Sequence, residues 1–359
     1  MSELPDVAWV AALASLPGMG PVRLAALLEE RRAPEAWDAV AGGRSPGVPE
    51  AVAIRWRAAA SVIDVAALWQ RHAEAGVRVL APGDAGWPAV LSEDPEPPAV
   101  LFALGEPGVL DRPRVAVVGT RRCSYAGREV ARALGRDLSD AGVCVVSGLA
   151  LGIDGAAHAG ALDGPTPPAA VVATGLDVVY PRRHAALWRE VGARGVILSE
   201  YPLGVWPERW RFPARNRIIA ALADVVVVVE SHERGGSMHT VESALERDRL
   251  VMAVPGSVRS PASEGTNALL AAGSPPARDA ADVLVALGLD RGAWERAPAM
   301  VPPVGDAGTV LDAVGWEPST LEQIADRAGA PLGPVAVHLT GLIAEGWVAH
   351  GAGWYERLR

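Results

Sequence analysis

Residues 212–222 read Phe-Pro-Ala-Arg-Asn-Arg-Ile-Ile-Ala-Ala-Leu, so that two arginines and an amide stand directly before an apolar run of helical character. Five valines, Val225 to Val229, follow after a short break and end at Glu230. A continuous β-branched run beside a helical segment is typical of a central strand of a parallel sheet, buried on both faces. Because doubly wound sheets bind ligands at the edge where their strands end, the polar cluster is expected beside a binding site.

The same pattern recurs over a large part of the chain. Apolar runs of strand length alternate with helical segments, which predicts an α/β domain over residues 81–290 with a Rossmann-like, doubly wound, mostly parallel sheet. The six predicted strands are Arg114–Val118, Val143–Ser147, Ala169–Ala173, Gly195–Leu198, Val225–Val229 and Leu250–Val254.

Two smaller domains are predicted on either side of this one. Residues 1–80 are expected to be all-helical, and Gly18-Met19-Gly20 resembles the turn of a helix-hairpin-helix or SAM-like element, which can hold a DNA phosphate or serve only in packing. Residues 291–308 are rich in Pro and Gly and indicate a linker. Residues 309–359 suggest three short helices and a terminal hairpin, as in a winged helix. Residues 305–359 contain three arginines and seven acidic residues, so partner docking or packing is favoured over duplex binding.

Composition argues against several classes of protein. The 359 residues suffice for two or three domains, and no apolar run approaches the roughly 18 residues needed to cross a bilayer. The N-terminal residues Met-Ser-Glu-Leu-Pro-Asp do not resemble a secretory signal, so we expect a soluble cytoplasmic protein with no membrane partner. Cys123 and Cys144 are too few for a zinc knuckle or a disulfide framework, so no metal site is predicted, and Cys144 is expected in the core.

The placement of arginine carries the functional signal. The net charge of −9 argues against coating nucleic acid by bulk electrostatics, and all 33 basic side chains are arginines. After the first predicted strand, residues 119–121 read Gly-Thr-Arg and can offer N–H groups and a guanidinium to a phosphate. The Gly-x-Gly-x-x-Gly fingerprint of dinucleotide-binding proteins is missing, so no cofactor is predicted. After the second strand, Ser147, Gly148 and Gly152 precede a helix that begins near Asp154 and points its positive end at an anion.

Later loops combine arginines with aromatic rings. Arg182 follows Tyr180-Pro181, residues 201–212 alternate Tyr, Trp and Phe with arginines, and Gly236 and Ser237 open the helix after the valine strand. Guanidinium groups bind phosphates while aromatic faces stack unpaired bases. This mixture favours a groove for single-stranded nucleic acid, and a hydrophobic lid with solvated arginines is the alternative.

These motifs, in this order, resemble the DNA-processing protein A family (DprA, also called Smf) over roughly residues 85–285. The resemblance rests on Val-Gly-Thr-Arg at 118–121, Ser-Gly-Leu-Ala-Leu-Gly-Ile-Asp at 147–154 with His158, Tyr-Pro at 180–181, Ser-Glu-Tyr-Pro at 199–202, Phe-Pro-x-Arg-Asn-Arg at 212–217, Val-Pro-Gly at 254–256 and Gly-Thr-Asn at 265–267.

The resemblance implies a recombination mediator that binds and protects incoming single-stranded DNA and helps to load a RecA-type recombinase during natural transformation. It also implies a homodimer, and it brings no catalytic residue. Together with the loop chemistry it predicts DNA contacts at Gly119, Thr120, Arg121, Ser147, Gly148, Gly152, Asp154, Arg182, Arg215, Asn216, Arg217, Gly236 and Ser237.

Two positions depart from the family pattern. His184 stands where an asparagine is expected after Tyr-Pro-x-x, and Glu242, seven residues after Gly235, is reminiscent of the nucleoside-monophosphate phosphoribohydrolases of the lysine-decarboxylase-like (LOG) family. An enzyme in which Glu242 assists glycosidic cleavage of a nucleotide is therefore an alternative. A nucleotide-sensing regulator that uses the winged helix is a third, weakened by the acidity of residues 305–359.

Overall fold

The computed structural model describes residues 4–29, 31–44, 47–289, 302–351 and 353–358. The chain divides into two compact units, Met1–Asp290 and Arg291–Arg359. Across the described residues, every helix is too short or too polar to cross a bilayer.

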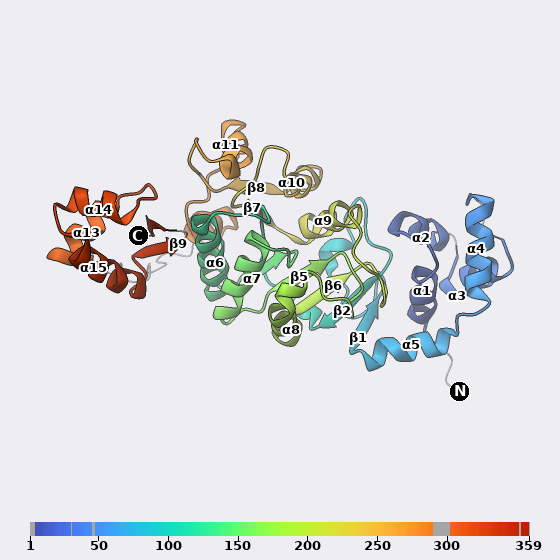
Figure 1. Cartoon of the computed structure of the whole chain (residues 1–359). Coiled ribbons are helices and arrows are strands. Elements are labelled where there is room, and N and C mark those ends of the chain that lie inside the picture. Colours follow the sequence, from blue (N-terminus) through green and yellow to red (C-terminus); the bar gives the residue numbers. More distant parts are fainter. Residues whose placement is uncertain (1–3, 30, 45–46, 290–301, 352, 359) are drawn as a thin grey trace. The chain divides into compact units, whose positions relative to one another are not determined.

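An eight-stranded sheet forms the centre of the first unit (Figure 1). In the spatial order β1-β2-β6-β5-β4-β3-β7-β8, strands β3 to β8 pair in parallel, whereas β1 and β2 add two antiparallel strands beside β6. The strands are β1 (Val77–Leu80), β2 (Leu101–Gly105), β3 (Arg114–Val118), β4 (Cys144–Ser147), β5 (Ala169–Val172), β6 (Val196–Ser199), β7 (Val225–Val228) and β8 (Leu250–Ala253).

The mostly parallel sheet and all six predicted strands are confirmed. The two antiparallel strands were not predicted, and β1 lies inside the segment expected to be all-helical. Both are apolar runs of four or five residues, which are too short for their periodicity to separate strand from helix.

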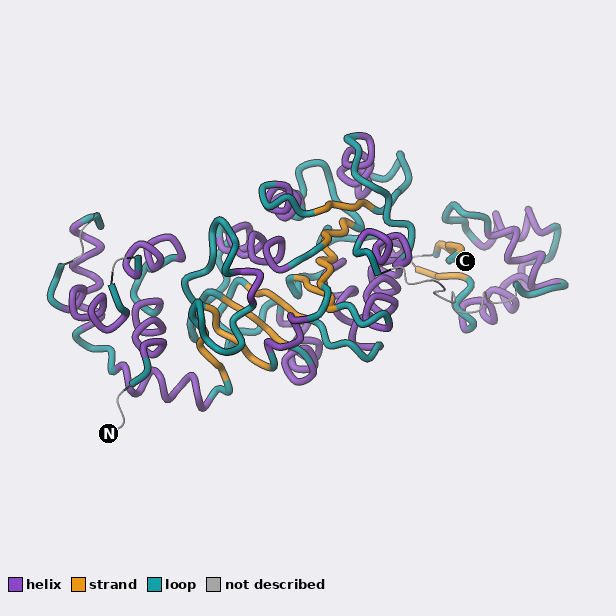
Figure 2. The backbone as a smooth tube through the Cα atoms, turned by 180° about the vertical axis from the view of Figure 1, so that it is seen from behind, coloured by secondary structure: helices purple, strands orange, loops and turns teal. Residues whose placement is uncertain are grey.

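Helices cover both faces of the parallel strands, as Figure 2 shows from behind. Alternate residues of β3 enter two different cores: Val115 and Val117 pack with α6 and α7, and Ala116 and Val118 with α9 and α10. Because both faces are buried, the strands read as continuous apolar runs. The helices on the first face are α6 (Tyr125–Asp140), α7 (Ile153–Asp163), α8 (Ala185–Arg194) and α12 (Ala280–Ala286), and those on the second are α9 (Arg211–Leu222) and α10 (Met238–Leu245).

The order of the strands reverses between β3 and β7. From β3 the chain continues through β4, β5 and β6 on one side, and β7 and β8 lie on the other side. Loops that leave two strands at such a switch point diverge and open a crevice at the carboxyl ends of the strands. The loops after β3 and β7 are therefore the place to look for a ligand site.

Five helices precede the sheet, α1 (Asp6–Ala14), α2 (Pro21–Leu28), α3 (Ala33–Ala41), α4 (Glu50–Ala60) and α5 (Val65–Glu74). The turn between α1 and α2 contains Gly18 with φ +71°, and Trp56 donates from its indole N–H to the carbonyl of Pro17 at 3.1 Å. This hydrogen bond ties the turn to α4. A contact of the turn with DNA stays a prediction, as does a separate domain over residues 1–80.

The second unit contains α13 (Asp306–Val314), α14 (Leu321–Ala328), α15 (Leu332–Ala344) and a hairpin of β9 (Val348–Gly351) and β10 (Trp354–Arg357). Val314, Ile324, Leu339 and Trp347 are among the residues of its own apolar core. Helix α13 begins at Asp306, inside the range 291–308 that was predicted as a linker, and residues 291–301 of that range lie outside the described residues.

Candidate functional site

A cleft of about 710 Å³ opens at the switch point between β3 and β7. Its walls come mainly from the loops after these two strands and from α7, α9 and α10, and the loops after β4, β5 and β6 add Ala150, Tyr180 and Arg209. The residues that line it are Val118, Gly119, Thr120, Arg121, Arg122, Ala150, Asp154, Tyr180, Arg209, Phe212, Pro213, Arg215, Asn216, Ile219, His232, Gly235, Gly236, Ser237, His239 and Thr240.

The loop after β3 is tied to the end of β7. The N–H of Thr120 donates to the carbonyl of Glu230 at 2.7 Å, and the buried Glu230 carboxylate accepts from the N–H and the hydroxyl of Ser124 at 2.8 and 2.6 Å. A Cβ on Gly119 would lie 2.6 Å from Ile153 and 2.7 Å from the Glu230 carbonyl, so only glycine fits there. The N–H groups of this loop are thus held rigidly at the edge of the cleft.

The loop after β4 packs under the loop after β3. The hydroxyl of Ser147 is buried and donates to the carbonyl of Val117 at 2.7 Å, so this residue supports the loop. Gly152 precedes α7 with φ +80°, and an added Cβ would lie 2.3 Å from the carbonyl of Thr120. Ser147 and Gly152, which were predicted to contact DNA, therefore lie behind the residues that line the cleft and support the loop after β3.

Arg215 forms a buried positive floor to the cleft. Its guanidinium donates to the carbonyl of Gly148 at 2.8 Å and to that of Val171. Burial lowers the pKa of Arg215 to about 10, and the neighbouring charge of Asp154 opposes this shift. Burial likewise raises the pKa of Asp154, whose carboxylate accepts from the N–H of Gly148 at 3.1 Å.

Exposed arginine and aromatic rings meet at the mouth of the cleft. The guanidinium carbon of Arg121 lies 4.6 Å from the ring centroid of Phe212, within the range of a cation–π contact. The ring of Tyr180 lies 5.6 Å from that of Phe212. This mouth therefore offers a positive charge and two aromatic rings together.

The opposite wall is the loop after β7 and the start of α10. Gly236 and Ser237, two of the predicted DNA contacts, line the cleft, and Asn216 donates to the carbonyl of Gly236 at 3.2 Å. The Ser237 hydroxyl donates to that of Ser231 at 2.8 Å. The N–H groups of Met238 and Thr240 in α10 already donate to the carbonyls of Gly235 and Ser237. An anion at this wall would therefore meet the N–H groups of Gly236 and Ser237, just before the helix.

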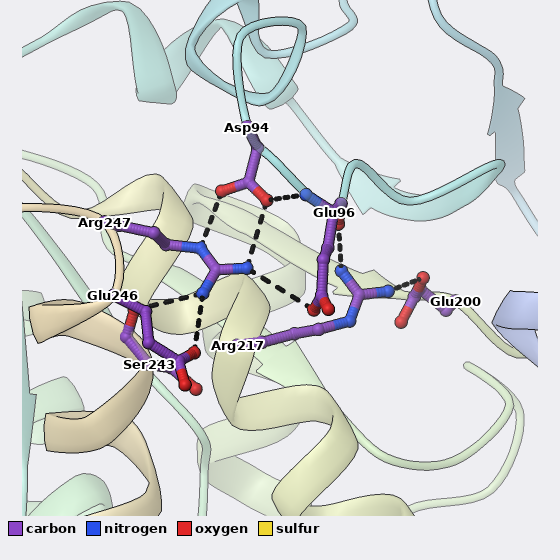
Figure 3. A network of polar contacts seen from close by, with 7 residues as sticks. All are labelled: Asp94, Glu96, Glu200, Arg217, Ser243, Glu246 and Arg247. Atoms are coloured by element: carbon purple, nitrogen blue, oxygen red, sulfur yellow. Dashed lines mark hydrogen bonds and ion pairs between the residues drawn. The ribbon is translucent and has the colours of Figure 1, made fainter.

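Two predicted arginines do not line this cleft. Arg182 is exposed in the short 3₁₀ turn Arg182–His184. Arg217 forms an ion pair with Glu200 and donates to the carbonyl of Glu96 at 2.7 Å (Figure 3). The helical period explains the split within residues 215–217, because side chains two positions apart on a helix point to opposite sides.

Sequence reasoning left out several lining residues. Arg209 and Phe212 belong to the aromatic segment noted above, but were not assigned as contacts. His232, His239 and Thr240 flank Gly235-Gly236-Ser237, and proximity to those glycines was the only signal that could have found them.

The structure does not favour the hydrolase alternative. The Glu242 side chain is 68% exposed, pairs with His239 at 3.2 Å and does not line the cleft. His158 is fully buried, and burial lowers its pKa to about 3, so it packs as a neutral ring against the sheet. Cys144 is fully buried in β4, as expected.

The cleft is positive although the chain is acidic. Four arginines line it, Arg121, Arg122, Arg209 and Arg215, against one carboxylate, Asp154. With a net charge of −9 for the whole chain, this concentration of arginine favours an anion as the ligand of the cleft.

Comparison with known proteins identifies the family of this chain. The family described as DNA recombination-mediator protein A matches residues 78–288. Protein Smf of Escherichia coli strain K12 is 37% identical over 281 residues, which cover 76% of this chain and 75% of that protein.

Two solved structures share the fold. DNA processing protein A from Streptococcus pneumoniae superimposes with a TM-score of 0.67 at 33% identity, covering 79% of this chain and 98% of that one. DNA processing protein A from Helicobacter pylori, described for its single-stranded DNA binding mode, gives a TM-score of 0.54 at 30% identity, covering 60% and 96%. This chain therefore belongs to the DNA recombination-mediator protein A family, the DprA or Smf proteins.

Proposed function

We propose that this protein binds single-stranded DNA in the cleft between the loops after β3 and β7 and acts as a recombination mediator. One observation carries the proposal: four arginines and one carboxylate line a cleft in a chain with a net charge of −9. The single-stranded DNA binding mode described for the Helicobacter pylori relative supports the choice of ligand.

The two kinds of chemistry in the cleft suit the two parts of a nucleotide. Phosphates would accept from the N–H groups of Gly119, Arg121, Gly236 and Ser237 and pair with the guanidinium groups of Arg121 and Arg209. Unpaired bases would stack on Phe212 and Tyr180 at the mouth. A duplex hides its base faces, so this mouth suits a single strand better.

The wider role follows from family membership. We propose that the protein protects incoming single strands and helps to load a RecA-type recombinase during natural transformation, in the cytoplasm and as a homodimer. We further propose that the C-terminal unit is a winged helix used for packing or partner docking, because three arginines face seven acidic residues from residue 305 onward.

The test is fluorescence anisotropy of a labelled oligothymidine and a matched duplex at several salt concentrations. We expect tighter binding of the single strand, with log K falling as log[salt] rises. Arg121→Ala should reduce the slope of that plot by about 0.7, the value for one single-strand phosphate contact. Arg189→Ala is the matched control, since Arg189 is exposed on α8 and its Nε donates to the carbonyl of Ala185 in the same helix.

Equal affinity for both DNA forms would overturn the choice of a single strand. An unchanged slope in a folded Arg121→Ala protein would overturn the assignment of the cleft.

A further inference from the structure

Arginine residues also gather behind the cleft, in a network drawn in Figure 3. Arg247, just after α10, forms two hydrogen bonds with Asp94, from Nε at 2.7 Å and from Nη2 at 3.1 Å. Both side chains are 3% exposed. The Nη1 group of Arg247 also donates to the carbonyl of Ser243 within α10, at 3.0 Å.

Arg217, in helix α9, contacts the same segment as Arg247, residues 94–96. Its Nη1 group donates to the backbone carbonyl of Glu96, and its Nη2 group pairs with the Glu200 carboxylate. The two side chains of this pair are 16% and 3% exposed. Residues 94–96 are thus bonded to the back of α9 and to the end of α10 at once, and Glu200 adds a tie to the end of β6.

The same two helices form one wall of the cleft. Helix α9 carries Phe212, Arg215 and Asn216 into it, and α10 carries His239 and Thr240. A shift of either helix would move the stacking ring and the phosphate-binding amides relative to Arg121 on the opposite loop. Contacts behind the helices that hold them in place would therefore also hold the walls of the cleft.

We propose that Arg217 and Arg247, with residues 94–96 and Glu200, form a positioning network that holds α9 and α10 in the DNA-binding arrangement, and that Arg217 does not contact DNA. This inference rests on the proposed function of the cleft. The buried Glu200 carboxyl group already accepts a hydrogen bond from the Arg217 guanidinium, so a phosphate would have to displace Glu200 to reach it. Arg121 has no such carboxylate partner among the described ion pairs and stands at the mouth.

Salt dependence separates a contact from a positioning residue. Arg217→Ala should weaken oligothymidine binding roughly tenfold, a typical size for coupling between sites, and should leave the slope of log K against log[salt] at the wild-type value. Arg121→Ala, measured in parallel, should lower that slope by about 0.7. A slope lowered equally by Arg217→Ala would make Arg217 a phosphate contact and overturn the inference.

One further variant, Arg217→Lys, keeps the test decisive if Arg217→Ala folds poorly, and a double variant tests the coupling of Arg217 with Glu200. Arg217→Lys retains the charge but cannot reach both acceptors with one planar fork, so affinity should still fall. If Arg217 bound a phosphate, lysine would preserve both affinity and slope. Glu200→Gln combined with Arg217→Ala should lose no more affinity than Arg217→Ala alone, because both changes remove the same pair.

Hydrogen exchange tests the positioning network in the absence of DNA. In Arg217→Ala the amides of residues 211–222 should exchange faster than in wild type, whereas in Arg121→Ala they should be unchanged. Unchanged exchange in Arg217→Ala would overturn the positioning role. If the wild-type protein binds no single strand, the proposed function fails, and the exchange data still decide whether the network holds α9.

Discussion

The cleft and the network behind it both contain arginines, but the arginines have different roles in the two places. At the mouth of the cleft, Arg121 is exposed and lies over Phe212, so its charge is available to a ligand. Behind α9, Arg247 is 3% exposed and its guanidinium is engaged by Asp94. An exposed guanidinium keeps its charge for a partner in solution, whereas a buried one is committed to the carboxylate that made its burial possible. The exposed fraction of an arginine and its hydrogen-bond partner thus indicate whether it binds a ligand or stabilises the fold.

The largest effect is expected from Arg247→Ala. The change leaves Asp94 buried without its counter-charge, and breaking a buried pair in this way costs about 3–5 kcal/mol of unfolding free energy. Urea denaturation measures it. The control is Arg132→Ala, which removes an exposed pair with Asp163 and should cost about 0–1 kcal/mol. Equal losses in the two variants would remove the distinction between buried and exposed arginines.

The next effect is a pH dependence carried by Glu200. Burial raises its pKa from 4.5 to about 7, and Arg217 opposes the rise. Because the folded-state value is the higher one, the stabilisation is complete below about pH 4.5 and is lost as the pH rises through about 7. The total is on the order of 3 kcal/mol.

Glu200→Gln should abolish this part of the pH dependence. Urea denaturation of both proteins between pH 4.5 and 8 should give a profile for the variant that falls less steeply than that of the wild type. Parallel profiles would show that Glu200 does not titrate in this interval.

A smaller effect is expected beneath the floor of the cleft, from Gly148→Ala. The added Cβ would lie 2.2 Å from Nη1 of Arg215, so the buried guanidinium must move from its carbonyl partners. Overpacking of this kind costs about 1–3 kcal/mol. Gly236→Ala is the control, because nothing lies within 4 Å of its added Cβ. Thermal unfolding of the two variants should differ clearly; matching transitions would mean that Arg215 can shift freely.

The smallest effect is expected from Phe212→Leu. Leucine keeps an apolar side chain but loses the face on which a base could stack, so affinity for oligothymidine should fall by about 1 kcal/mol, the low end for one stacked base. A strand of the same length made of abasic sites should bind both proteins alike. A loss of affinity for the abasic strand as well would assign Phe212 to holding Arg121 in place.

Much of the fold was predictable because its signals are local. The valine run of β7 and the other parallel strands are continuous and apolar, since both faces of each strand are buried. The antiparallel strands β1 and β2 escaped prediction because four or five residues carry no decisive period. In the site, Gly119, Arg121 and Gly236 were found from loop chemistry, and all three line the cleft.

The sequence alone determined the alternation of strands and helices, the glycine- and arginine-bearing loops, and the membership of the family. Only the tertiary structure decided which arginines face a ligand. Arg215 and Arg217 are two positions apart, yet one forms the floor of the cleft and the other pairs with Glu200 behind it. Arg247 meets Asp94 across 153 positions of chain. Local patterns specify secondary structure through short-range sterics and periodicity, but the partner of a charged side chain is set by long-range packing.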